Sequence, residues 1–404
     1  MVAGWGMEIV LGLGDSIDYE IRWDSAVFEG LIREFGLSRA ELNTNTPIKT
    51  ERDLLITILG FLKDSGGGER FVGDPAIIEN FSRHFKNKIT LGGTAIRAAI
   101  AMDKLGYTFA LHLVTINRHV KRLMPKGCVW ICSNQEESSY PHLIVQFSRG
   151  AKVNTADVSI ETTRANRIIY TNDRDNELVR IHPELQNLLI GAKVFLLSGF
   201  NAMHDASLVE DRSREIRRIL RSLIQKPIVF FEDGHYHVPE LHKIVKNYLL
   251  EYIDIYSLNE DELQGSLGRK VLLTDAGAVG EALRSLHEII PVKLLVVHTK
   301  FWALAYGADA PRYGDALLGG ITMATTRFRL GDDFAKEDYR DTGLLAPEEP
   351  GKLFSREIKA SLGDRVCCVP SFQVPEEDAT TIGLGDAFVG GFLPALIKIN
   401  QGEN

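Results

Sequence analysis

VFLLSGFNAMHDASLVEDRSREIRRILRSLIQKPIVFFE, residues 194–232, contains the unit that decides the fold. Its apolar runs Val194–Phe200 and Ile228–Glu232 have strand length, and Ser207–Ile224 between them carries apolar residues at helical spacing. The same alternation continues along the chain. Its further strand-like runs are Ile253–Leu258 and Leu294–His298, and its further helix-like segments are Pro239–Leu250 and Ala276–Ile289. Short apolar strands that alternate with amphipathic helices predict βαβ units and a parallel sheet covered on both faces.

The first half of the chain has a less regular pattern. We expect strands at Glu8–Gly14 and Phe109–Val114 and a glycine-initiated helix at Gly93–Leu105. Further helical pieces, a glycine run and a hairpin-like alternation suggest insertions that form a smaller lid. They are Ala26–Phe35, Glu51–Lys63, Ser65–Gly68 and Cys128–Arg149, the last with its turn at Asn134–Ser139. The tail Thr326–Arg365 is charged and irregular before a last expected strand at Val366–Val374.

Composition limits the classes of function. The 404-residue chain has a net charge of −8, so no global basic field attracts nucleic acid or anionic lipid. No run approaches about 18 uninterrupted apolar residues, and Met1–Gly14 contains Glu8 and no basic segment, so it is a strand rather than a signal peptide. The four cysteines have no zinc spacing, and adjacent Cys367 and Cys368 lie in an apolar run. We therefore expect reduced thiols and a cytoplasmic protein.

The strongest local signal is Thr380-Thr381-Ile382-Gly383-Leu384-Gly385-Asp386, followed by an apolar helix. Glycines let the backbone amides of Gly383, Leu384 and Gly385 converge at a helix N-terminus, where phosphoryl oxygens bind well. Asp386 at the start of that helix can accept a hydroxyl proton. The alternative is a plain glycine turn in which Asp386 only favours the helix dipole, and the motif alone does not separate the two.

Several motifs in their order along the chain resemble the ADP-dependent glucokinase/phosphofructokinase family of the ribokinase-like superfamily. The matching segments are Gly12–Asp18, Gly92–Ala95, Asn166–Ile169, Leu197–Asn201, Ser257–Glu262, Val296–Lys300 and Thr381–Asp386. The resemblance implies a three-layer α/β sandwich with a mostly parallel sheet and a smaller discontinuous α/β lid. The large nucleotide-binding domain would comprise mainly 181–404 with parts of 1–15 and 89–130, and the lid parts of 16–88 and 131–180.

The same resemblance implies a role for each matched residue. Asp386 would be the catalytic base, with Gly383, Leu384 and Gly385 as the anion hole. The substrate would contact Asp18, Gly92, Gly93, Asn201 and Arg167, and the nucleotide would contact Asn259, His298 and Thr299. Glu262 and Glu232 would hold Mg²⁺, a hard cation that suits carboxylates at the carboxyl ends of strands. The expected reaction transfers the β-phosphoryl group of ADP to a hydroxyl of a sugar or sugar phosphate, by a monomer or dimer.

The sequence departs from the family pattern at two sites. Where the family has H-x-E, the chain has Phe230-Phe231-Glu232, and phenylalanine cannot hydrogen-bond in the metal shell. In the first motif, Gly14 and Ser16 stand where asparagines are usual, and Asp15 adds a charge. These changes fall at the metal and sugar pockets, so neither glucose nor fructose 6-phosphate follows as the acceptor.

Other residues have weaker signals. His235 and His237 could ligate a metal, but no third ligand has a zinc spacing, so a surface loop is favoured. Trp302 is either an adenine wall or a core aromatic, with the core favoured. Arg167 is the best candidate for an anion contact, because Asn166–Ile169 resembles the family's N-R-F-I strand, whose arginine points into the cleft. A guanidinium suits this role, since it can bind phosphate with two hydrogen bonds. The other basic candidates are Arg149, Lys152, Arg164 and Arg174.

Three alternative functions remain open at this stage. An ATP-dependent carbohydrate or nucleoside kinase of the wider superfamily would share Asp386 and the sheet. A non-catalytic nucleotide- or sugar-binding homologue would explain the altered motifs, because a fold can outlive its activity. A phosphatase-like hydrolase is less favoured, since the sequence shows no second base to activate water.

Overall fold

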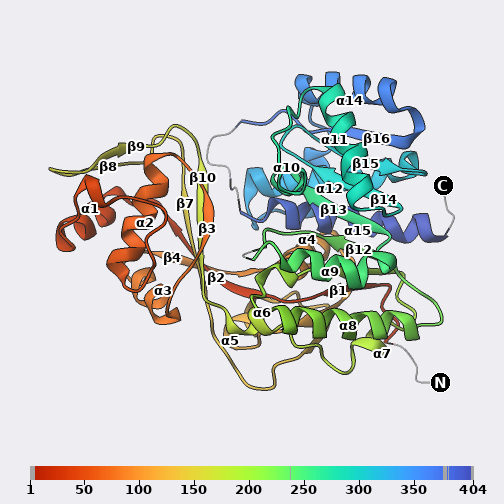
Figure 1. Cartoon of the computed structure of the whole chain (residues 1–404), viewed down its shortest axis with the longest axis horizontal. Helices are drawn as coiled ribbons and strands as arrows, with labels where there is room; N and C mark the ends of the chain where they lie inside the picture. The colour runs from red at the N-terminus through yellow and green to blue at the C-terminus, as the bar shows by residue number, and fades with distance from the viewer. Residues whose placement is uncertain (1–4, 237, 376–379, 381, 402–404) are drawn as a thin grey trace.

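The computed structural model describes residues 5–236, 238–375, 380 and 382–401. It contains a large α/β sandwich and a smaller unit that β2, β4 and β7 connect to it (Figure 1). None of its described helices is long and apolar enough to cross a membrane.

A nine-stranded sheet forms the centre of the large unit. In spatial order its strands are β16 (Val366–Pro370), β15 (Trp302–Gly307), β14 (Leu294–His298), β13 (Ile255–Asn259), β12 (Ile228–Glu232), β11 (Val194–Leu197), β1 (Ile9–Gly12), β5 (Ala110–Leu113) and β6 (Val129–Cys132). All neighbours from β14 to β6 pair in parallel, and β15 and β16 are added antiparallel at one edge. Two separate apolar clusters cover the two faces, which is why the central strands read as continuous apolar runs.

Helices cover both faces of this sheet. One face carries α6 (Arg174–Leu178), α7 (Leu185–Leu189), α8 (Ala206–Ser222), α9 (Leu241–Leu249), α10 (Glu260–Leu267), α11 (Ala276–Ile289) and α14 (Glu349–Leu362). The other face carries α4 (Thr94–Leu105), α5 (Arg118–Leu123), α12 (Gly314–Leu330) and α15 (Leu384–Gln401), with α13 (Lys336–Thr342) against α12. This is the ribokinase-like three-layer arrangement that the sequence predicts.

The small unit has its own sheet and core. Its five strands in order are β3 (Gly68–Phe71), β10 (Asn166–Thr171), β7 (His142–Phe147), β2 (Ser16–Arg22) and β4 (Asn87–Gly92). The helices α1 (Ser25–Glu34), α2 (Glu51–Lys63) and α3 (Pro75–Ser82) pack on one face around a third apolar cluster, and β8 (Lys152–Asn154) pairs with β9 (Ser159–Glu161). Successive side chains of a strand point to opposite faces, so the even-numbered and odd-numbered residues of β2 face opposite sides of this sheet.

Two expectations from the sequence are wrong. The segment Cys128–Arg149 is not a hairpin, because β6 pairs with β5 of the large sheet whereas β7 pairs with β2 and β10 of the small one. The tail Thr326–Arg365 is mostly helical, since it contains the end of α12, α13 and α14. The buried Phe354 and Ile358 of α14 are one helical turn apart and anchor it among charged residues.

Candidate active site

The glycine motif forms the N-terminus of α15, as the sequence predicts. Gly383 has φ +61, a backbone conformation that residues with a Cβ rarely adopt, and the helix begins at the next residue. The first amides of an α-helix have no partner within it, so the amides of this turn are free to bind an anion. Thr380 supports the turn, because its hydroxyl accepts from the Ile382 amide at 3.3 Å. Thr381 lies outside the described residues.

Asp386 lies in the first turn of α15 and its side chain is 24% exposed. Its Oδ2 is 3.8 Å from Nε of Arg97. A carboxylate at this place is accessible to a ligand and is oriented by a neighbouring cation, as a proton acceptor requires.

Arg97, on α4, was not identified from the sequence. Its side chain is 4% exposed, and its Nη2 donates to Asp18 Oδ2 at 2.6 Å and lies 3.5 Å from Glu20 Oε1. Burial alone lowers the pKa of Arg97, but the charges of Asp18, Glu20 and Asp386 raise it above its usual value, so the guanidinium is charged. Its Nη1 is buried and has no hydrogen-bond partner within the described part of the chain. The residue therefore connects the expected substrate aspartate to the expected base and keeps donors unused.

The arginine also explains two of the glycines. A Cβ on Gly383 would lie 2.8 Å from Arg97 Cδ, so the anion-hole turn packs directly on this side chain. A Cβ on Gly92 would lie 2.3 Å from Asp18 Oδ2. Gly93, with φ +90, then begins α4 and so places Arg97 one turn into the helix.

Asp18 faces this centre, but its carboxylate is already engaged. Ser16 Oγ donates to Oδ1 at 2.9 Å, and Arg97 holds Oδ2. The side chain is only 4% exposed. Each oxygen could accept a second hydrogen bond, so it is the burial of this carboxylate, rather than a lack of acceptor sites, that limits access of a sugar hydroxyl.

Two further arginines lie beside Asp386. Arg327 of α12 donates through Nε to the Ile382 carbonyl at 2.8 Å and forms an ion pair with Asp332, which fixes the N-terminal side of the glycine turn. Burial and then the charge of Arg97 lower the pKa of Arg327 to about 9. Arg167 of β10 comes from the small unit. Burial lowers its pKa, and the charge of Asp386 opposes that shift.

Acidic groups gather at the carboxyl ends of β12 and β13. Glu232 Oε1 is 3.0 Å from His298 Nε2, and Glu232 Oε2 is buried without a hydrogen-bond partner in the described structure. Asn259 and Glu262 form a capping box at the start of α10, with the Asn259 amide donating to Glu262 Oε2 at 2.8 Å. Burial, and the charges of Asp233 and Glu232, raise the pKa of Glu262 well above its ordinary value. These carboxylates make a negative pocket that a cation would stabilise.

His298 joins the acidic edge to the anion hole. Its ring stacks on Phe388 of α15 at 4.7 Å between centroids, and its Cε1 is 3.2 Å from the place of a Cβ on Gly385. Burial by itself lowers the pKa of His298, but the hydrogen bond to Glu232 and the charges of Glu232, Glu260 and Asp386 raise it. The sequence resemblance singled out His298 for nucleotide binding, and the structure gives it contacts with both halves of the site.

The remaining predicted residues have varied surroundings. Asn201 lies against Gly234, where a Cβ would be 2.8 Å from its Cγ. The Thr299 hydroxyl is used in the β14–β15 turn, where it accepts from the amides of residues 301 and 302. Trp302 is fully buried, stacks on Phe354 and donates to the Leu273 carbonyl, so it is a core residue.

Phe230 also belongs to the core, where it contacts Phe392 of α15 at 5.3 Å between ring centroids. His235 is exposed, and His237 lies outside the described residues. No group of three or more His, Cys, Asp or Glu with metal-binding geometry occurs among the residues that were placed. The other basic candidates, Arg149, Lys152, Arg164 and Arg174, are exposed.

Comparisons with known proteins identify the family and the fold. The model of the ADP-specific phosphofructokinase/glucokinase conserved region matches residues 7–282. No curated protein matches the sequence. Among solved structures, a phosphofructokinase from Pyrococcus horikoshii OT3 with AMP is 18% identical with a TM-score of 0.75, over 99% of this chain and 100% of that one.

Two other solved structures show how far the similarity extends. An ADP-dependent kinase in complex with fructose 6-phosphate and ADPβS is 15% identical, with a TM-score of 0.76, over 97% of this chain and 94% of that one. Adenosine kinase from Trypanosoma brucei brucei is more distant, at 13% identity and a TM-score of 0.51 over 99% and 94%. Such low identities establish the fold alone, whereas the family match covers more than half of the sequence. The chain belongs to the ADP-specific phosphofructokinase/glucokinase family.

Proposed function

We propose that this protein transfers the β-phosphoryl group of ADP to a hydroxyl of a sugar or sugar phosphate, with Asp386 as the general base. Family membership supports the donor and the class of acceptor. One observation carries the mechanism: Asp386 lies in the first turn of α15, beside free amides and within 3.8 Å of the Arg97 guanidinium. That arrangement brings a proton acceptor and phosphate-binding groups to one place.

The step can be written with its atoms balanced. The acceptor hydroxyl gives its proton to the Asp386 carboxylate as its oxygen forms a bond to the β-phosphorus. The bond from that phosphorus to the bridging oxygen breaks, and AMP leaves with the electron pair. The amides of Gly383, Leu384 and Gly385 bind the oxygens of the moving group, and Arg167 reaches them from the small unit. Closure of that unit would exclude water, which competes with the acceptor hydroxyl.

Magnesium assistance forms part of the proposal. Oε2 of Glu232 is buried with no hydrogen-bond partner among the described residues, and burial and neighbouring carboxylates raise the pKa of Glu262, which supports a cation held by these two side chains. Two protein carboxylates suit Mg²⁺, which keeps several waters and binds donor phosphates. When bound, the ion would neutralise charge on the phosphates. This chain has Phe230 where the family has a histidine. His298, two strands away on β14, hydrogen-bonds to Glu232 and so orients that carboxylate.

The engaged state of Asp18 favours one second candidate, a homologue that binds nucleotide without phosphorylating a sugar. Both oxygens of Asp18 already accept hydrogen bonds from Ser16 and Arg97. Because this carboxylate is also buried, an acceptor would bind more readily through other groups. The nucleotide-binding groups on α15 and β14 do not depend on this carboxylate.

A coupled assay with purified protein separates the candidates. ADP and ATP are each tested against hexoses, hexose phosphates, pentose phosphates and nucleosides, with AMP formation as the readout for ADP. We expect ADP-dependent turnover with one acceptor class, and Asp386→Asn should lower kcat about 10²- to 10⁴-fold. Asp364→Asn, at a side chain that is 92% exposed, is the matched control and should leave kcat unchanged. Turnover with ATP but not with ADP would show that the donor is ATP. An unchanged kcat in Asp386→Asn would overturn the mechanism.

A further inference from the structure

A cavity lies on the opposite side of the small sheet from Asp18. Along β2, Asp18 and Glu20 face Arg97, whereas Tyr19 between them faces the other way. Tyr19 pairs directly with Ile89 of β4, and both side chains line the cavity. Its volume is about 530 Å³, within the range of small-ligand sites. The cavity is therefore separate from the proposed catalytic groups, although one strand serves both.

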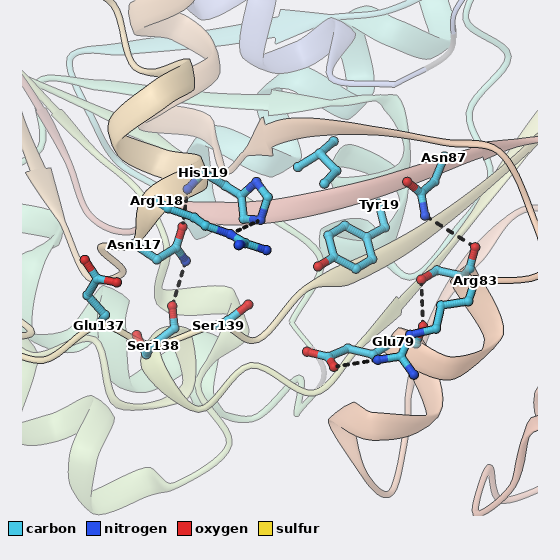
Figure 2. Close-up of a pocket in the computed structure, with 12 residues that line it drawn as sticks. Tyr19, Glu79, Arg83, Asn87, Asn117, Arg118, His119, Glu137, Ser138 and Ser139 are labelled. Atoms are coloured by element: carbon cyan, nitrogen blue, oxygen red, sulfur yellow. Dashed lines mark hydrogen bonds and ion pairs between the residues drawn. The ribbon is translucent and has the colours of Figure 1, made fainter.

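Both units contribute walls to this cavity (Figure 2). From the small unit come α3 and β4, with Glu79, Ser82, Arg83 and Asn87. From the large unit come the start of α5 and the β6–β7 connection, with Asn117, Arg118, His119, Glu137, Ser138 and Ser139. In Figure 2 the Tyr19 ring lies between the Arg118 side and the Arg83 side. An occupant would contact both units at once.

The large-unit wall is preformed. Asn117 accepts through Oδ1 from the amides of His119 and Val120, and its Nδ2 donates to the Ser138 carbonyl at 2.7 Å. The Ser138 hydroxyl also bonds to Asp175. These bonds hold the β6–β7 connection against α5, so a ligand would not need to order this wall.

The charges of the cavity leave Arg118 uncompensated. Glu137 pairs with Lys121 at 2.7 Å, and Glu79 is 3.9 Å from Arg83. Arg118 has no acidic partner in the described structure. Its Nε instead donates to His119 Nε2 at 3.2 Å.

That hydrogen bond fixes the state of the histidine. Nε2 of His119 can accept only when the ring is neutral. Burial, and then the charges of Arg118 and Arg122, lower the pKa of His119, in agreement with a neutral ring. The Nη1 and Nη2 groups of Arg118 have no hydrogen-bond partner within the described part of the chain. The Tyr19 hydroxyl also lacks a hydrogen-bond partner among the described residues. The cavity therefore offers unused donors, and of its two lining arginines and two lining glutamates only Arg118 has no ion-pair partner among the described residues.

We propose that this cavity binds a small phosphomonoester. Arg118 would take the phosphoryl group through its free guanidinium edge, which matches phosphate oxygens in geometry. Arg83 approaches from the small unit, and the Tyr19 ring supplies a flat surface for the organic part. Because such a ligand contacts both units, its binding is linked to their relative orientation. The ligand would not occupy the space around Asp386.

Isothermal titration calorimetry of the full-length protein tests the site with ribose 5-phosphate. Ribose is the uncharged control probe, and inorganic phosphate tests the bare anion. We expect ribose 5-phosphate to bind, ribose not to bind, and Arg118→Ala to weaken binding about tenfold or more. Arg122→Ala is the matched control, an exposed arginine of the same helix outside the cavity, and should leave the affinity unchanged.

The catalytic cleft could also bind phosphate, so a second variant separates the two sites. Arg167→Ala removes the proposed anion contact near Asp386. It should leave the affinity of the Arg118 cavity for ribose 5-phosphate unchanged. Binding that survives Arg118→Ala but disappears in Arg167→Ala would assign the anion to the cleft and overturn the proposal. Absence of ribose 5-phosphate binding up to about 1 mM would overturn it as well. These results measure binding and not kinase activity. The outcome for this cavity is therefore independent of the outcome for the proposed reaction.

Discussion

Replacing Gly383 with alanine tests the packing of the anion hole on Arg97. The residue has φ +61, where a Cβ costs about 1–2 kcal/mol. The new Cβ would also lie 2.8 Å from Arg97 Cδ, and the arginine is held by Asp18 at 2.6 Å. Overpacking of this kind costs about 1–3 kcal/mol. We therefore expect Gly383→Ala to lower the free energy of unfolding by about 2–5 kcal/mol, measured by urea denaturation.

The same substitution should impair catalysis. Displacement of the turn removes at least one amide donor from the moving phosphoryl group, a loss of about 10²- to 10³-fold in kcat. Gly36→Ala is the matched control, because Gly36 has φ +59 and no atom within 4 Å of its added Cβ. It should show only the backbone cost and full activity. If Gly383→Ala were as stable as Gly36→Ala and retained its kcat, tight packing of the turn on Arg97 would be refuted.

The other predictions concern buried charges. Arg97→Met should lower the free energy of unfolding in urea by about 3–5 kcal/mol, because it leaves Asp18 buried without its partner. Adding Asp18→Asn should recover part of this loss. Equal losses in the single and double variants would contradict the pairing. Burial raises the pKa of Asp15 to about 7 in the folded state, so the folded protein binds its proton more tightly than the unfolded chain does. This contribution to stability is complete below about pH 4 and is lost as the pH rises towards about 7, and Asp15→Asn should remove that part of the pH dependence in thermal unfolding. Glu232→Gln should lower the pKa of His298, measured by NMR titration of the ring, since the hydrogen bond and the charge of Glu232 hold that pKa up; an unchanged pKa would refute the contact.

The sequence predicted the large sheet well, because its signals are local. Runs such as Ile228–Glu232 and Leu294–His298 became strands with the predicted ends, and Ala276–Ile289 became a helix with the same bounds. The segment Cys128–Arg149 shows the limit of this reasoning. Alternation located its strands β6 and β7, but strand partners are set by distant segments, here β5, β2 and β10. The small-unit boundary between them could not be read from the pattern.

The sequence predicted the glycine turn and the base of the candidate site but did not predict the buried charges around them. Gly383 and Asp386 were found because a glycine turn before an apolar helix is visible in sequence. Arg97 was not, since a single arginine in a helix has no motif of its own. Its importance comes from Asp18, which is 79 residues away in sequence. Asp15 gave only the signal of an extra charge in a familiar motif, and the buried hydrogen bonds from residues 114 and 115 were not predictable.

The pairing of Arg97 with Asp18 changes what the acceptor has to offer. A free aspartate would accept hydrogen bonds from sugar hydroxyls, but this one already accepts from Ser16 and Arg97. Displacing the arginine would separate a buried ion pair, at a cost of about 3–5 kcal/mol. The Nη1 group of Arg97, which is buried and has no hydrogen-bond partner among the residues that the structure describes, needs no such displacement. An acceptor that presents an oxygen to Nη1 and its hydroxyl to Asp386 therefore binds at lower cost than one that seeks the carboxylate of Asp18. The substrate screen should accordingly favour acceptors with a hydrogen-bond acceptor next to the reacting hydroxyl over acceptors that offer only donors.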